Sequence, residues 1–176
     1  MAVRLLLLTA RPELETNRRL QAAATDLGVD VTAADLSVMT ASAGTEGFKI
    51  QGRSPVEPLP DAVIARVGNW RPESALSVLE SLVALGVSTP NPPSAIRLGR
   101  DHWSTVRMLA RSGLAVPDTV AGVDVEILAA ASVEQLGLPV VVKQRRSRMG
   151  VGVIRCESRD HLEAVQLGGD SRRQRG

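Results

Sequence analysis

The chain has 176 residues, of which 44% are hydrophobic and 23% are charged, which is typical of a soluble globular protein. No apolar stretch is long enough to span a membrane, and the single cysteine, Cys156, excludes an intramolecular disulfide and a cysteine-built metal site. The net charge of +2 is uneven: residues 1–142 carry 12 basic and 15 acidic side chains (−3), and residues 143–176 carry 9 and 4 (+5). We therefore expect a cytoplasmic protein whose C-terminal part meets an anionic partner.

The first part of the chain predicts an α/β fold. The apolar run Val3–Thr9 predicts a buried strand, and Val29–Ala33 predicts a second one. Between them, the amphipathic segment Leu14–Leu27 predicts a helix that ends at Gly28. A strand, a helix and a strand in this spacing are typical of a parallel sheet. The expected elements that follow are a loop over 37–47, a hairpin between 48 and 56 that turns at 52–55, a strand over 61–67 and a helix from Pro72 that ends at Gly86.

A proline-rich segment, Val87–Pro93, predicts a domain boundary, because three prolines in four residues cannot continue a helix or a central strand. After Leu167 no apolar residue remains, so residues 168–176 are expected to form a disordered tail. The sequence thus predicts two domains, residues 1–93 and 94–167, before that tail. Within the second domain the expected elements are a helix over 101–112, a strand over 116–120, a helix near 129–136, strands over 138–143 and 151–155, and a helix from 160.

A lysine at a strand end is the strongest candidate for chemistry. The chain has two lysines against nineteen arginines, and Lys143 closes the apolar run Leu138–Val142. Gly150 and Gly152 follow it, before the next predicted strand. A compact ammonium group next to glycines, which let backbone N–H groups approach an anion, is typical of a phosphate site. The lysine comes before the glycines here, whereas in a P-loop the glycines come before the lysine. A Rossmann fingerprint has its glycines after the first strand, where this chain has none.

Three segments carry a family resemblance. The strand Leu138–Val142, with Lys143 and the glycines at 150–152, resembles the first half of the nucleotide site of ATP-grasp ligases. Asp61–Gly68 and Met108–Pro117 are similar to the RimK-type group, which adds glutamate to a protein or small-molecule carboxylate. The resemblance covers about residues 3–166. It implies a Rossmann-like pre-ATP-grasp α/β domain, followed by a partial α+β first lobe of an ATP-grasp domain.

The resemblance also implies a chemistry, in which ATP and Mg²⁺ phosphorylate a carboxylate and an amino acid's amine attacks the acyl-phosphate. Lys143 would then bind the nucleotide phosphates, and the glycine loop would cover them. Arg66, which closes a strand of the first domain, is a weaker candidate for the substrate cleft. The candidate ATP-binding residues are Lys143, Gly150, Gly152, His102, Arg145, Arg146 and Arg148.

Three departures from the family pattern affect these expectations. His102 occupies the place of a second nucleotide-binding lysine, and neutral imidazole binds phosphate poorly near pH 7. Arginines replace an acidic, glycine-rich stretch in the loop after Lys143, and they also read as a solvated basic loop. The family's magnesium ligands belong beyond residue 170, so no residue is assigned to a metal. The expected protein is an incomplete, truncated ligase that is inactive as this chain alone and that self-associates.

Two alternatives remain open. The chain could be a non-catalytic binding or regulatory module that keeps the α/β domain as an interaction surface. It could instead bind an anionic polymer weakly through residues 143–176. A dedicated nucleic-acid domain is disfavoured, because a chain with no Tyr, one Phe and two Trp offers few rings on which bases could stack.

Overall fold

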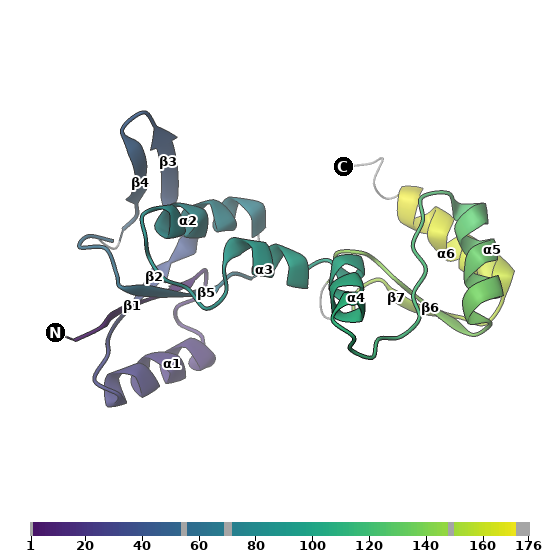
Figure 1. Ribbon diagram of the computed structural model, residues 1–176, viewed down its shortest axis with the longest axis horizontal. Helices are drawn as coiled ribbons and strands as arrows, with labels where there is room; N and C mark the ends of the chain where they lie inside the picture. Colours follow the sequence, from purple (N-terminus) through teal and green to yellow (C-terminus); the bar gives the residue numbers. More distant parts are fainter. Residues whose placement is uncertain (1, 54–55, 69–71, 148–149, 172–176) are drawn as a thin grey trace. The chain divides into compact units, whose positions relative to one another are not determined.

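The computed structural model describes residues 2–53, 56–68, 72–147 and 150–171 (Figure 1). The chain divides into two compact units, Met1–Ile96 and Arg97–Gly176, and each unit has its own hydrophobic core. Within the described residues no helix combines the length and the apolar character that crossing a membrane requires. The mixed α/β class expected from the sequence is confirmed.

A three-stranded parallel sheet organises the first unit, with strand order β2-β1-β5. Its strands are β1 (Arg4–Thr9), β2 (Asp30–Asp35) and β5 (Ala62–Arg66), which pair in parallel on both sides of β1. Helices α1 (Glu15–Asp26) and α2 (Pro72–Ala84) lie on opposite faces of this sheet (Figure 1). The predicted strand–helix–strand opening is therefore present, and the C-terminal ends of all three strands meet at one edge of the sheet.

The core of the first unit lies between the sheet and α2. Alternate strand residues such as Leu6 and Leu8 face the helix, as the two-residue period of a strand requires. The helix contributes Leu76, Leu79 and Leu82, three leucines with no exposed surface. Their spacing of three residues places them on one side of α2, so a continuous apolar layer joins helix and sheet.

The small hairpin lies elsewhere than the sequence predicted. Strand β3 (Thr40–Gly44) pairs antiparallel with β4 (Gly47–Gln51), after a short 3-10 helix, η1 (Leu36–Val38). The segment expected to be a loop is therefore mostly a strand, and the hairpin turns at residues 45–46. The residues of β3 are small and show no alternation of apolar and polar side chains, so the sequence did not predict a strand. Backbone hydrogen bonding to β4 does not require large side chains. Of the turn expected at 52–55, residues 54–55 lie outside the described residues.

Among its described residues, the second unit combines three helices and the end of a fourth with a two-stranded antiparallel sheet. Its elements are the end of α3 (Pro93–Gly99), then α4 (His102–Arg111), α5 (Val125–Leu136), β6 (Val140–Lys143), β7 (Val153–Cys156) and α6 (Arg159–Ser171). Strands β6 and β7 pair with each other. The hydrophobic core of this unit consists of Ala129 of α5, Val140 of β6, Cys156 of β7 and Leu162 of α6. This small core supports the strand that ends at Lys143.

Three elements of the second unit differ from the predictions. The prolines at 90–93 predicted only a break, but helix α3 begins at Pro93. Proline is favoured at the first position of a helix. The segment 116–120 is not a strand, and Pro117 cannot donate a ladder hydrogen bond. Helix α6 runs to Ser171 through two glycines, which weaken a helix without preventing it, and residues 172–176 of the expected tail lie outside the described residues.

We expect Cys156 to react slowly with thiol reagents in the folded protein. The side chain has no exposed surface, and its burial raises the pKa of the thiol, so little reactive thiolate forms at neutral pH. Labelling with a chromogenic disulfide reagent should be slow in buffer and rapid in denaturant. Equal rates in both solutions would contradict the buried position of Cys156.

Candidate functional site

The hairpin of β6 and β7 places Lys143 beside the predicted glycines. Lys143 is the last residue of β6, its side chain is exposed, and it pairs in register with Val153. The next residue, Gln144, donates its backbone N–H to the carbonyl of Gly152 at 3.2 Å. No carboxylate among the described residues forms an ion pair with Lys143. The ammonium group is therefore available to an anion at the end of the strand.

Both glycines adopt a backbone conformation that side chains disfavour. Gly150 has φ of 74° and Gly152 has φ of 73°, in the left-handed region. A Cβ atom on Gly152 would also lie 2.7 Å from Cγ and Cδ of Gln144. The positive φ therefore favours glycine at position 152, and a side chain there would also require Gln144 to move.

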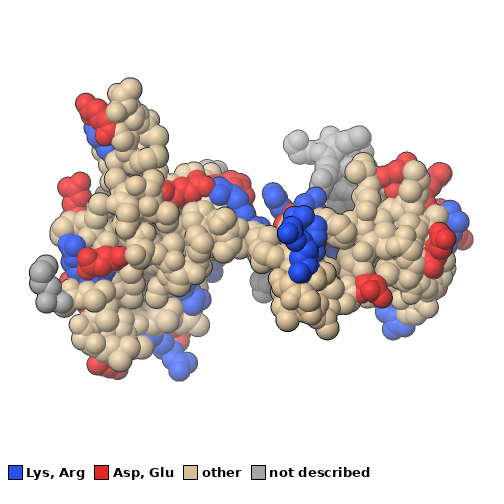
Figure 2. Space-filling view, viewed as in Figure 1, with Lys and Arg blue, Asp and Glu red and all other residues tan. Residues whose placement is uncertain are grey.

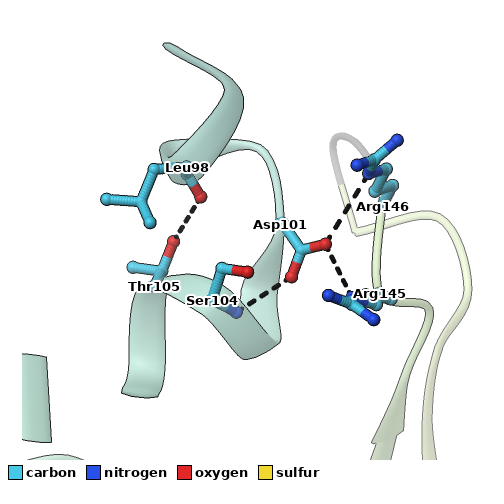
Figure 3. A network of polar contacts seen from close by, with 6 residues as sticks. All are labelled: Leu98, Asp101, Ser104, Thr105, Arg145 and Arg146. Carbon is cyan, nitrogen blue, oxygen red and sulfur yellow. Dashed lines mark hydrogen bonds and ion pairs between the residues drawn. The ribbon is translucent and has the colours of Figure 1, made fainter. Parts of the chain in front are cut away.

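A buried carboxylate connects the loop after β6 to the start of α4. Asp101 is the N-cap of α4, and its Oδ1 accepts a hydrogen bond of 2.9 Å from the backbone N–H of Ser104. Its Oδ2 accepts one of 2.6 Å from Nε of Arg145, and Nε of Arg146 lies 3.7 Å away. Figure 3 shows the two arginines on the side of the carboxylate opposite Ser104. One carboxylate thus caps a helix and holds a basic loop.

The charge of Asp101 is maintained by its hydrogen bonds. Burial of the carboxyl group raises its pKa, but the backbone N–H of Ser104 and the guanidinium of Arg145 outweigh that effect and hold the pKa below its usual value. The group is therefore ionised at neutral pH. Only 5% of its side-chain surface is exposed, so it needs the cationic partners that the loop provides.

Further contacts between the same two segments fix the loop. The backbone N–H of His102 donates to the carbonyl of Arg145 at 2.9 Å, and Nε2 of His102 lies 3.4 Å from Oγ of Ser147. Thr105 also closes the turn before α4, donating from its hydroxyl to the carbonyl of Leu98 at 2.9 Å. The start of α4 and the first residues after β6 are therefore held together.

The predicted ATP-binding residues meet only in part. Lys143 ends β6, and Arg145 and Arg146 follow it. Gly150 and Gly152 belong to the turn into β7, and His102, which begins α4, contacts the carbonyl of Arg145. Figure 2 shows Lys and Arg side chains gathered on this part of the second unit. Arg148 lies outside the described residues. The side chains of Arg145 and Arg146 are 61% and 70% exposed, as in the solvated loop read from sequence, and each also lies within ion-pair distance of Asp101.

Arg66 lies in the first unit, at the C-terminal end of β5. Its side chain is exposed and donates from Nη2 to the hydroxyl of Thr16, in the first turn of α1, at 3.4 Å. Its partner in β1 is Thr9, which also accepts hydrogen bonds from Arg11 and Asn17. Arg66 is thus at the sheet edge where open α/β sheets bind ligands, and its substrate role stays a prediction.

Asp101 is the residue of this cluster that sequence reasoning missed. The sequence predicted a helix that starts at Asp101, and aspartate is a typical N-cap residue. Nothing in the sequence joined it to a loop 44 residues later. No group of three or more His, Cys, Asp or Glu side chains could hold a metal ion, as far as the described residues go.

Two family models match almost the whole chain. Residues 3–96 match the RimK PreATP-grasp domain, and residues 99–171 match the RimK-like ATP-grasp domain.

Two curated relatives share a name. A "Probable alpha-L-glutamate ligase" of Mannheimia succiniciproducens is 32% identical over 160 residues, which cover 86% of this chain and 53% of that protein. A protein of the same name from Pasteurella multocida is 27% identical over 171 residues, which cover 93% of this chain and 54% of the relative. The chain therefore spans about half the length of the curated relatives it matches.

Solved structures share the fold. A RimK domain ATP-grasp protein from Sphaerobacter thermophilus superposes with a TM-score of 0.71 at 22% identity, over 96% of this chain and 59% of that one. An N5-carboxyaminoimidazole synthase from Aspergillus clavatus, solved with ADP and 5-aminoimidazole ribonucleotide, gives 0.62 at 19% identity, over 95% and 43%. At these identities the likeness is one of fold.

Proposed function

The chain belongs to the RimK-like ATP-grasp family, and from that premise we propose that its second unit binds the phosphates of ATP. The reaction served would be the ATP-dependent joining of an amino acid, glutamate in the first instance, to a carboxylate of a protein or small molecule. The name of the curated relatives supports glutamate as the amino acid. We also propose the domain division into residues 1–93 and 94–167.

The observation that carries the proposal is the position of Lys143. Its exposed ammonium lies at the end of β6, next to a turn of two left-handed glycines whose backbone lies close to the strand end. Arg145 and Arg146 follow it and share the carboxylate of Asp101. Lys143 and the two arginines thus carry three positive charges against one negative charge. Phosphoryl transfer depends mainly on positioning and charge neutralisation, which such a group supplies.

Mg²⁺ accompanies ATP in the proposed reaction, where it would neutralise phosphate charge. The described residues do not form a magnesium site, so we assign none of them to the metal. The residues of this chain would bind and orient the nucleotide: Lys143 as a point charge on the phosphates, and the glycine turn as backbone that can lie close to them.

The test is Mg-ATP binding by the Lys143→Ala variant, measured by isothermal titration calorimetry. We expect the dissociation constant to rise about 10- to 100-fold, because one charge-assisted contact of roughly 1.5–3 kcal/mol is lost. Lys49→Ala is the matched control, because Lys49 is the only other lysine and pairs with Glu46 in the hairpin of the first unit. It should bind Mg-ATP like the unmodified chain.

Equal affinities of the two variants and the unmodified chain would overturn the proposal. An absence of Mg-ATP binding by the unmodified chain would do the same, and it would favour the non-catalytic interaction module. Inactivity of this chain alone and self-association stay predictions.

A further inference from the structure

The two loop arginines contact Asp101 through an unusual part of their side chains. Both approach Oδ2 with Nε, Arg145 at 2.6 Å and Arg146 at 3.7 Å. A guanidinium has five N–H donors, of which Nε supplies one and the two Nη atoms supply four. Among the described residues none accepts a hydrogen bond from Nη of either arginine, and both side chains are more than 60% exposed. The outer donors of both guanidinium groups are therefore free for a second anion.

Asp101 itself is fixed by the helix that it caps. Ser104 donates to one carboxylate oxygen, and Thr105 donates its backbone N–H to the Asp101 carbonyl at 2.9 Å. The carbonyl of Arg145 is held by the backbone N–H of His102, on the same turn of α4. Arg145 is thus attached to α4 at two points, its backbone and its side chain. Such attachment removes most of the freedom that an exposed arginine on a loop would have.

Resting on the proposed function, we infer that Asp101 is a positioning residue: its buried carboxylate holds Arg145, and more loosely Arg146, so that their Nη groups face the phosphates of a nucleoside triphosphate beside Lys143. A preset guanidinium binds phosphate more tightly than a mobile one, because its ordering is complete before the ligand arrives. The opposite role is a carboxylate that competes with phosphate for the arginines, and it predicts the opposite change in affinity.

The Asp101→Asn variant separates positioning from helix capping. Asparagine caps a helix about as well as aspartate, so α4 should stay folded and the midpoint of thermal unfolding should fall only by the contribution of the lost ion pair. The ion pair to Arg145 is lost, and we expect Mg-ATP to bind about tenfold more weakly, as when one charge-assisted hydrogen bond disappears. Asp124→Asn is the matched control: Asp124 caps α5 by the same bond, to the Ile127 N–H at 2.9 Å, and pairs with no arginine among the described residues.

A double variant tests whether Asp101 acts through the arginine. Arg145→Gln should weaken Mg-ATP binding. Asp101→Asn combined with Arg145→Gln should bind only slightly more weakly than Arg145→Gln alone, because only the looser contact of Asp101 with Arg146 is left to lose. Additive losses would show that Asp101 acts by another route. Affinity of Asp101→Asn equal to that of the unmodified chain, or tighter, would overturn the inference.

Hydrogen exchange without nucleotide separates a failure of this inference from a failure of the proposed function. In Asp101→Asn, peptides that contain residues 144–147 should exchange faster than in the unmodified chain, and in Asp124→Asn they should not. Unchanged exchange would overturn positioning whether or not ATP binds. If exchange is faster in Asp101→Asn but the unmodified chain does not bind Mg-ATP, the proposed function is overturned. Asp101 then orders the loop without any role in phosphate binding.

Discussion

A Leu162→Ala variant is expected to lose about 2–5 kcal/mol of unfolding free energy in the second unit, the cost of truncating a fully buried leucine. Leu162 is 1% exposed and packs with Ala129, Val140 and Cys156 in a small core. Few other apolar side chains can fill the cavity, so relaxation recovers little. Because Val140 begins the strand that Lys143 ends, loss of this core should also weaken Mg-ATP binding.

Hydrogen exchange resolved along the chain measures this effect, since it reports β6 and β7 separately from β1. We expect protection to fall in the second unit and to persist in the first, because the two cores share no residue. Leu114→Ala is the control, as Leu114 is 57% exposed in the same unit and its loss should matter little. Equal protection of β6 in the Leu162→Ala variant and the unmodified chain would contradict the described core.

A Leu79→Ala variant should lower the free energy of unfolding of the first unit by about 2–5 kcal/mol. Leu79 has no exposed surface and lies on α2 between Leu76 and Leu82, against the parallel sheet. Removing three carbons there leaves a cavity in the layer that joins helix and sheet. Exchange of the β1 amides reports the loss, because β1 is the central strand of the order β2-β1-β5.

Leu27→Ala is the control for this variant, because Leu27 is 81% exposed and its truncation should cost little. Mg-ATP affinity provides a second comparison. The proposed phosphate site lies wholly in the second unit, so Leu79→Ala should leave it nearly unchanged under conditions where the chain stays folded. A large loss of affinity with full protection of β1 would show that Leu79 acts in some way other than packing.

Elements with a strong periodic pattern were predictable from sequence. The strand at β1, the helix at α1 and the strands that became β6 and β7 were each located to within a few residues. Their apolar residues recur with the period of a strand or a helix, which marks an element in the sequence. In β1 most of these residues are buried, whereas Leu20 of α1 and Leu27 directly after it are exposed, and the period alone located the helix. The family resemblance rested on the strand that ends at Lys143 with its glycines, and on Asp61–Gly68 and Met108–Pro117. The family models confirm it.

Elements without such a pattern were not predictable. Strand β3 consists of small residues, and only pairing with β4 makes it a strand. The segment at 116–120 has the composition of a strand, but no described strand lies beside it to pair with. A strand forms only when a second segment pairs with it. The composition of one segment therefore predicts a strand only where a pattern of buried apolar residues is also present.

The sequence by itself determined the α/β class, the family and Lys143 as the candidate phosphate anchor, because local patterns of apolar residues and glycines carry that information. Only the tertiary structure decided what surrounds Lys143. It joined Asp101 to Arg145 across 44 residues and left the outer donors of the arginine free among the described residues. A carboxylate that caps a helix looks the same in sequence whether or not a guanidinium reaches it. Such a contact exists only because folding brings the start of α4 to the end of β6.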